Sequence, residues 1–225
     1  GAIGDLMQRG RDPLVGTTPH ETIISVRIVA SGDTREHASE LIEPDAAEVR
    51  RRLGDLVFGE DKATLADAVA VLLLRTGCTV AVAESCTGGL LAKSLTDVSG
   101  SSKYFVRSYV TYSNQSKVEL LDVSAEMLEQ HGAVSEQVAR AMATGCRRKA
   151  GVDYAIGITG MAGPTGGTAE KPVGLVYIAL ACPEGCEAQE RRFGEHLLRG
   201  HIRDRACKAA LNMLRLALIE RAGNT

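Results

Sequence analysis

From residue 64 onward the chain alternates between helical and strand-like spacing of its apolar residues, and this alternation limits the fold more than any other feature. Thr64 to Gly77 predicts a helix, because a capping hydroxyl stands three residues before a carboxylate and the apolar run ends at a glycine. Thr79 to Ala83 has the apolar, β-rich character of an interior strand, and residues 90–98 return to helical spacing. Strand, loop and helix in this order predict an α/β fold, a layered α/β/α domain with a mixed sheet.

The same alternation continues towards the end of the chain. Capping serines and closing glycines delimit the longer helices. Further strands are expected at 104–112, 154–159 and 174–181, with a hairpin partner at 189–193, and helices are expected within 115–130 and at 135–150 and 201–222.

The first part of the chain reads as a smaller, separate unit. Residues 21–30 are β-branched and partly alternating, which predicts one strand after a Gly/Pro-rich lead-in. Residues 33–38 predict a short helix, and Pro44 stands where a second helix would begin. We therefore expect a small α+β domain over residues 1–55 and the layered domain over 56–225.

The charge balance bears on the partners of the protein. The chain has 26 lysines and arginines against 28 aspartates and glutamates, and this balance gives no general basic surface. A nucleic-acid partner is therefore not expected. No run of about 18 apolar residues appears, nor a basic and apolar leader, so a cytoplasmic protein without a membrane partner is expected.

The six cysteines are scattered through predicted strands and helices, which is typical of reduced thiols. Cys182 and Cys186 flank Pro-Glu-Gly like half of a metal site, but no second Cys or His pair stands at a suitable spacing. We expect no metal site.

Three segments follow predicted strands with small or polar residues, which is where open α/β sheets gather ligands: AESCTGG (83–89), VTYSNQSK (110–117) and GITGMAGPTGG (157–167). In the first, Ser85, Cys86 and Thr87 are candidate nucleophiles beside a helix start, where free backbone N–H groups stabilise negative charge. The same hydroxyls fit a plain helix cap equally well.

The second segment supplies Tyr112 and Lys117. A serine hydroxyl needs activation, and all five histidines lie outside the three segments. This favours a Ser-Lys or Ser-Tyr-Lys arrangement over Ser-His-Asp. Lys117 alone is more often a solvated surface lysine.

The third segment is rich in glycine and lets the backbone approach a ligand closely, although a plain long turn fits it as well. It matches neither the P-loop nor the dinucleotide fingerprint. Thr159 ends the preceding strand and is placed to donate into the same crevice. Arg199 and Arg203 are one helical turn apart, so both fit an anion on one helix face, although surface arginines are usually solvated.

Together these segments resemble the CinA C-terminal family, also known as the nicotinamide mononucleotide deamidase family. The resemblance covers roughly residues 64–220, and the combined motifs are highly specific. Residues 6–30 also resemble the small KH-type linker domain of longer CinA proteins, which implies a fragment or a short form. The matching segments are 83–102, 110–117, 131–136, 153–167 and 170–179.

The resemblance implies hydrolysis of the carboxamide of nicotinamide mononucleotide to nicotinic acid mononucleotide and ammonia, with no cofactor. It implies Ser85 as nucleophile and Lys117 and Tyr112 as the groups that activate it and shuttle the proton. The residues expected to support or bind the nucleotide substrate are Glu84, Thr87, Gly88, Thr159, Gly160, Gly163 and Arg199.

One corner departs from the family pattern. Leu197 and Leu198 stand before Arg199 where the family usually has Gly-Asp, which puts substrate preference in doubt. Two alternatives therefore remain: a weakly catalytic binding or regulatory module linked to competence, and an enzyme acting on another nucleotide. For the first, residues 9–18 offer no G-x-x-G loop of the kind that KH domains use. The apolar last helix suits a subunit interface as readily as a core, and we expect a homodimer.

Overall fold

The structure is a computed structural model that describes residues 1–20 and 22–223. Glu21, the first residue of the predicted strand 21–30, lies outside the described residues. The chain divides into two compact units at Lys62 and Ala63. Each unit is described by itself.

The smaller unit is a two-stranded hairpin with one long helix. Strands β1 (Leu14–His20) and β2 (Ile23–Val29) pair antiparallel, and helix α1 spans Arg35–Leu53. A 3-10 turn (Gly54–Leu56) follows α1. The core of this unit consists of Ile3, Leu6, Val15 and Val49, with Val26, Ile28 and Leu53 packed against it.

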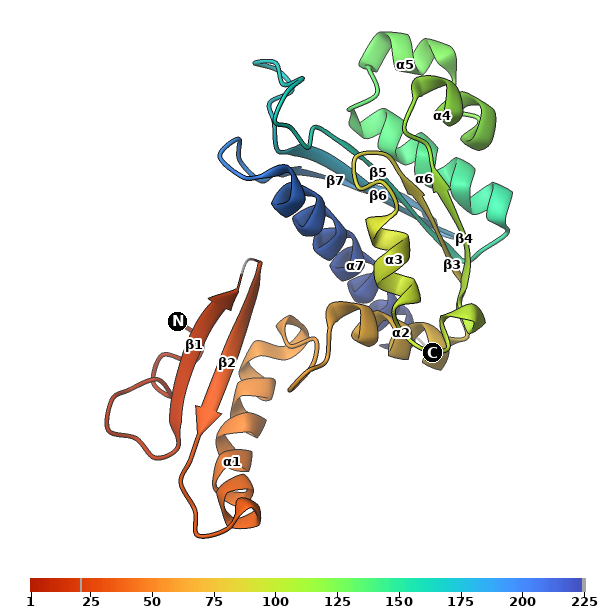
Figure 1. Ribbon diagram of the computed structural model, residues 1–225. Coiled ribbons are helices and arrows are strands. Elements are labelled where there is room, and N and C mark those ends of the chain that lie inside the picture. Colours follow the sequence, from red (N-terminus) through yellow and green to blue (C-terminus); the bar gives the residue numbers. More distant parts are fainter. Residues whose placement is uncertain (21, 224–225) are drawn as a thin grey trace. The chain divides into compact units, whose positions relative to one another are not determined.

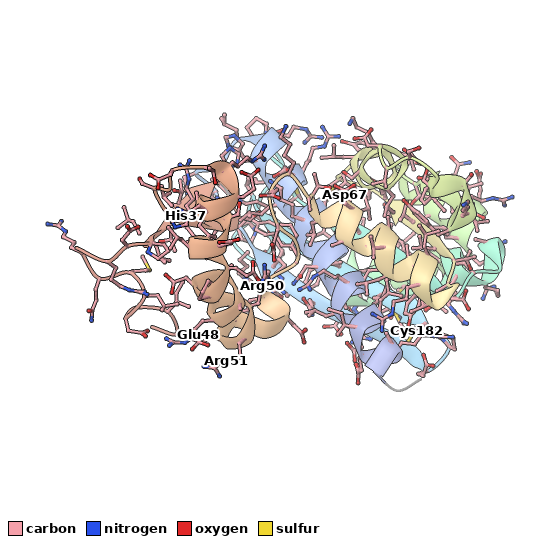
Figure 2. All side chains as sticks on the ribbon, turned by 90° about the horizontal axis from the view of Figure 1, so that it is seen from below. His37, Glu48, Arg50, Arg51, Asp67 and Cys182 are labelled. Carbon is pink, nitrogen blue, oxygen red and sulfur yellow. The ribbon has the colours of Figure 1, made fainter. Side chains whose placement is uncertain are left out.

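Two predictions for this unit were wrong. Strand β1 lies in the lead-in that was read as irregular; its Pro19 is tolerated because a strand at a sheet edge does not need every backbone N–H. Helix α1 is continuous through Pro44 and is not two helices. Proline removes one backbone hydrogen bond from the helix, but α1 is held to this unit directly after Pro44 by the Asp45–Arg11 ion pair and by Val49 in the core. Figure 2 labels Glu48 and Arg51, which form an ion pair further along α1.

The larger unit contains a five-stranded sheet in the order β4-β3-β5-β6-β7. Strand β3 is parallel to β4 and β5, whereas β6 is antiparallel to β5 and β7. This confirms the predicted mixed sheet. The strands are β3 (Val80–Glu84), β4 (Phe105–Val110), β5 (Tyr154–Gly160), β6 (Leu175–Cys182) and β7 (Gly185–Arg192).

Helices cover both faces of this sheet, as Figure 1 shows, and make the predicted three layers. One face carries α2 (Leu65–Thr76), α3 (Leu90–Thr96) and α7 (Arg199–Gly223). The other carries α4 (Asn114–Leu121), α5 (Ala125–His131) and α6 (Glu136–Ala150). A 3-10 turn (Ser101–Lys103) precedes β4.

Local signals explain several of these elements. Thr64 and Asp67 form the predicted capping box of α2, and Figure 2 labels Asp67 there. Gly157 lets α6 approach β5 closely, because a Cβ at Gly157 would lie 2.5 Å from the carbonyl oxygen of Ala139. Much of the apolar surface of α7 is buried in the core of this unit: Ile202, Ala206, Ala210, Leu214 and Leu218.

Two boundaries matter for the site. Strand β7 spans 185–192 and not 189–193, because it follows β6 through a tight hairpin and its charged residues lie on an exposed sheet edge. Strand β4 ends at Val110, so Tyr112 lies in the following loop and not in the strand as predicted.

No helix within residues 1–20 and 22–223 combines the length and apolarity that crossing a membrane requires.

Candidate active site

The three segments that follow β3, β4 and β5 meet at one edge of the sheet, because the carboxyl ends of parallel strands lie together. A cavity of about 330 Å³ lies there, within the range typical of small-molecule sites. The N-terminus of α7 completes its wall. The lining residues are Ser85, Cys86, Tyr112, Lys117, Ala133, Val134, Thr159, Gly160, Met161, Ala162, Gly163, Thr165 and Arg199.

Ser85 is the first residue after β3 and is half-buried. Its backbone N–H donates to the Ile158 carbonyl at 3.0 Å, so the neighbouring strand β5 fixes its position. Its Oγ accepts a hydrogen bond from Lys117 Nζ at 3.2 Å. The structure thus brings the candidate nucleophile and the candidate base into direct contact.

Lys117 lies on α4 and is completely buried, so it is not the solvated surface lysine that its residue type favours. Its Nζ donates to the carbonyls of Thr111 at 2.7 Å and Tyr112 at 3.5 Å. Burial lowers the pKa of its ammonium group, because a charged amine is poorly solvated there. Burial therefore shifts the equilibrium of Lys117 towards the neutral amine beside the Ser85 hydroxyl.

Glu84 does not line the cavity, although it was expected to support or bind substrate. Its buried carboxylate accepts from the backbone N–H groups of Gly89 at 3.0 Å, Leu91 at 3.1 Å and Ala92 at 2.8 Å. It therefore caps the start of α3, where the N-cap residue Gly89 has no side chain to do so. Ser85 lies before this cap position, so the helix-cap interpretation of its hydroxyl does not hold.

Cys86 and Thr87 lie beside the nucleophile and are buried. Burial raises the pKa of the Cys86 thiol to about 12, so it stays protonated at neutral pH and is a poor nucleophile. Thr87 and Gly88 do not line the cavity. The Thr87 carbonyl instead accepts from Arg203, and Gly88 adopts a left-handed conformation with φ of 55°.

Thr159 and Gly160 form the end of β5 and line the cavity. The Thr159 hydroxyl donates to the Ala133 carbonyl at 2.7 Å, which ties the loop between α5 and α6 to the sheet. A Cβ at Gly160 would lie 2.7 Å from the Val176 side chain. Gly163 is similarly confined, because a Cβ there would lie 2.5 Å from the Val173 side chain.

Arg199 joins two walls of the cavity at its exposed rim. Its Nη1 donates to the Gly163 carbonyl at 2.7 Å and its Nη2 donates to the Tyr112 hydroxyl at 3.0 Å. The Tyr112 side chain is 63% exposed, and Arg199 is exposed as well. The Tyr112 hydroxyl thus contacts the arginine and, unlike Ser85, has no hydrogen bond to Lys117 in the described part of the chain.

Arg199 and Arg203 do not both face the cavity: Arg199 lines it, whereas Arg203 does not and donates to the Thr87 carbonyl. Sequence reasoning missed this role, and spacing along the helix carries no signal for it. Leu198, which stands before Arg199 where the sequence departs from the family pattern, is 70% exposed.

All six cysteines are free thiols, and Cys182 lies at the end of β6 (Figure 2). Among the described residues no three His, Cys, Asp or Glu side chains converge as a metal site would require.

Comparison with known proteins identifies the family. The family model of the CinA C-terminal domain matches residues 62–218, and the model of the damage-inducible protein CinA KH domain matches residues 1–59. The chain belongs to the CinA family. The small first unit is thus the KH-like domain that the sequence predicted.

Relatives in the CinA family are considerably longer than this chain. A CinA-like protein of Parasynechococcus marenigrum is 45% identical over 217 residues, which cover 96% of this chain and 52% of that protein. A CinA-like protein of Geotalea daltonii is 49% identical over 201 residues, covering 89% of this chain and 48% of that protein. The chain thus spans about half the length of these CinA relatives.

Solved structures agree with the CinA fold. The competence/damage inducible protein CihA from Agrobacterium tumefaciens is similar with a TM-score of 0.67 and 42% identity, over 72% of this chain and 98% of that one. A CinA superfamily protein from Klebsiella pneumoniae matches with a TM-score of 0.66 and 36% identity, over 69% of this chain and 96% of that one.

Proposed function

We propose that this protein hydrolyses the carboxamide of nicotinamide mononucleotide to nicotinic acid mononucleotide and ammonia, with Ser85 as the nucleophile. The observation that carries the proposal is the contact of 3.2 Å between Ser85 Oγ and the buried Nζ of Lys117. The family resemblance supplies the substrate. The contact supplies the chemistry, because a serine next to a neutral amine is an activated nucleophile.

The surroundings of Lys117 suit a general base. A neutral amine has two N–H donors and one lone pair, and Nζ has two carbonyls and one hydroxyl as neighbours. When the carbonyls of Thr111 and Tyr112 accept the two N–H bonds, the lone pair faces the Ser85 hydroxyl. The lowered pKa keeps this form populated at a lower pH than for an exposed lysine.

The reaction follows in two halves. Lys117 removes the proton of Ser85 Oγ as Oγ bonds to the carboxamide carbon, and the carbonyl electron pair moves onto oxygen. The oxyanion then collapses, the C–N bond breaks, and the Lys117 ammonium group protonates the departing nitrogen to release ammonia. Water, deprotonated by Lys117, attacks the resulting ester and releases the acid, and the proton returns to Ser85 Oγ.

Recognition of the nucleotide belongs to the rim of the cavity. Arg199 uses two of its five N–H donors on Gly163 and Tyr112, and the others remain for a phosphate. Gly160 and Gly163 line this wall where a side chain would clash with Val176 or Val173. A flat nicotinamide ring can pack against the backbone there. Tyr112 holds Arg199 in place and does not take part in proton transfer.

The test is ammonia release by the purified chain from nicotinamide mononucleotide, nicotinamide riboside and nicotinamide, with a metal chelator present throughout. We expect release from the mononucleotide, much less from the other two, and background release in Ser85→Ala. Release that persists in Ser85→Ala would overturn the serine mechanism.

The same assay separates the alternatives. A folded wild type that releases no ammonia from any of the three compounds would favour a binding or regulatory module. Release from a different nucleotide amide, with the mononucleotide inert, would favour another substrate. The exposed Leu198, which replaces a usual acidic residue, would then be the first position to revert.

A further inference from the structure

Arg203 is a charged residue that contacts the nucleophile loop and that the mechanism above does not use. We define this loop as residues 85–89. Arg203 is half-buried on α7, and its Nε and Nη2 donate to the Thr87 carbonyl at 3.2 and 2.6 Å. Within residues 1–20 and 22–223 it forms no ion pair. A guanidinium removed from water is usually paired with a carboxylate, so a neutral carbonyl as its partner calls for a reason.

Arg203 is one of few side chains that form a hydrogen bond to the nucleophile loop. Gly88 and Gly89 have φ values of 55° and 93°, a region that glycine enters freely. The loop is fixed at its start by the N–H of Ser85 on Ile158 and at its end by the Glu84 carboxylate. Within it, the Gly88 N–H donates to the Ser85 carbonyl at 3.1 Å and the Leu90 N–H donates to the Thr87 carbonyl at 3.2 Å. In the middle, the buried Thr87 hydroxyl has no hydrogen-bond partner in the described chain. The Thr87 carbonyl thus accepts from the Leu90 N–H and from Arg203, and Arg203 is the side chain that ties this middle point of the loop to α7.

Next to this fixing point are two free backbone donors. No hydrogen bond to another residue of the described chain engages the N–H groups of Cys86 and Thr87, which directly follow the nucleophile. Amides in this place stabilise the oxyanion in acyl-transfer enzymes, provided that they are aimed before the reaction begins. A fixed Thr87 carbonyl limits rotation of the backbone on both sides of Thr87.

We propose that Arg203 is a positioning residue, which aims the N–H groups of Cys86 and Thr87 at the oxyanion formed when Ser85 attacks. The inference rests on the proposed serine mechanism. Arg203 touches neither the cavity nor the reacting atoms and acts through the loop. Its role is thus distinct from that of Arg199 one turn earlier on α7, which lines the cavity.

Electrostatics point in the same direction. Burial dominates at Cys86 and raises the pKa of its thiol, but the charges of Arg199 and Arg203 oppose that rise. The positive charge of Arg203 therefore reaches the residue next to the nucleophile. No ion pair within the described chain offsets it there, so it also favours a negative charge on the intermediate.

The test compares Arg203→Lys with the matched control Arg205→Lys, which makes the same exchange two residues along α7. Lysine keeps the charge but cannot make the two-armed contact. We expect Arg203→Lys to lower kcat on the order of 100-fold with KM unchanged, because misaligned catalytic groups cost about that much. Arg205→Lys should leave both constants unchanged. In Arg203→Ala, added methylguanidinium should restore part of kcat. Thermal unfolding by circular dichroism checks that each variant is folded.

A second readout does not depend on the substrate. Labelling of Ser85 by a fluorophosphonate, located by mass spectrometry, also forms an oxyanion-like centre and should slow in Arg203→Lys but not in Arg205→Lys. If wild type is labelled at Ser85 but does not hydrolyse nicotinamide mononucleotide, the substrate proposal fails and the labelling rate decides on Arg203.

Several outcomes would overturn the inference. An active wild type with an unaffected Arg203→Lys would overturn it alone. A rise in KM at unchanged kcat would instead make Arg203 a substrate-binding residue. If Arg203→Lys is unfolded, the absence of rescue in a folded Arg203→Ala counts against the inference. A wild type without hydrolysis and without labelling would remove the proposed function and this inference together.

Discussion

At the floor of the cavity Lys117 is completely buried, whereas at its rim Tyr112 is 63% exposed. The floor, comprising Ser85, Lys117 and Thr159, is fixed by strand ends and backbone carbonyls. At the rim, the exposed Arg199 links Gly163 to Tyr112 by donating to both. In the proposed reaction the two regions have different tasks: burial at the floor lowers the pKa of the base, and the exposed donors at the rim exchange their partners for those of the substrate.

The largest effect is expected for Lys117→Met at the floor of the cavity. We expect kcat to fall about 10²- to 10⁴-fold, the range for loss of a general base. The free energy of unfolding should stay the same or rise, because methionine buries a similar length of chain without an amine. Ammonia release and thermal unfolding measure the two effects. Lys103→Met, an exchange of an exposed lysine, is the control and should change neither.

A second substitution tests the support beneath the floor. In Glu84→Gln the three N–H groups at the start of α3 lose a carboxylate acceptor, so the free energy of unfolding should fall by about 1–3 kcal/mol. Urea unfolding measures it. Glu187→Gln on the exposed edge strand β7 is the control and should change it by less than about 0.5 kcal/mol. Equal stability in the two variants would contradict the capping role.

At the rim, Arg199→Gln should raise KM for nicotinamide mononucleotide about tenfold and leave kcat nearly unchanged, because the proposed charged hydrogen bond from Arg199 to the phosphate would be lost. Nicotinamide riboside, which lacks the phosphate, supplies the control within the same variant. Its hydrolysis should be as slow in Arg199→Gln as in wild type. A drop in kcat alone would move Arg199 from recognition to chemistry.

The smallest effect is expected for Tyr112→Phe. Its hydroxyl accepts from Arg199, so loss of one hydrogen bond of about 1 kcal/mol should raise KM a few-fold. The result discriminates between the two roles suggested for this residue. A 100-fold loss of kcat would place the tyrosine in proton transfer, as the family resemblance alone suggested.

The sequence predicted the larger unit well because its signals are local. The capping box of α2 and the alternation around β3 and β5 fix these elements without distant contacts. The meeting of Ser85 and Lys117 was predictable for the same reason, since parallel strands place their carboxyl ends together.

What could not be predicted depends on contacts between distant residues. Arg199 meets Tyr112 across 87 positions and Arg203 meets Thr87 across 116, and no periodicity encodes such pairs. Strand β1 was missed because Pro19 within it and Pro13 just before it are atypical of strands, although pairing with β2 stabilises it. Glu84 is a different case, because it caps α3 only a few residues further along the chain. It looked like a ligand-binding residue because the carboxylate stands before the N-cap, outside the usual capping positions.

The central claim is that Lys117 acts as a neutral base, and the pH dependence of kcat tests it most directly. Burial lowers the pKa of Lys117 below its usual 10.5, so the active neutral amine appears at a lower pH than in the unfolded chain. Between the two pKa values the folded protein binds fewer protons, so this group also makes the free energy of unfolding rise with pH. We predict that kcat rises with pH through one ionisation below 10.5 and then levels off. A kcat that stays flat or falls across that range would contradict the account.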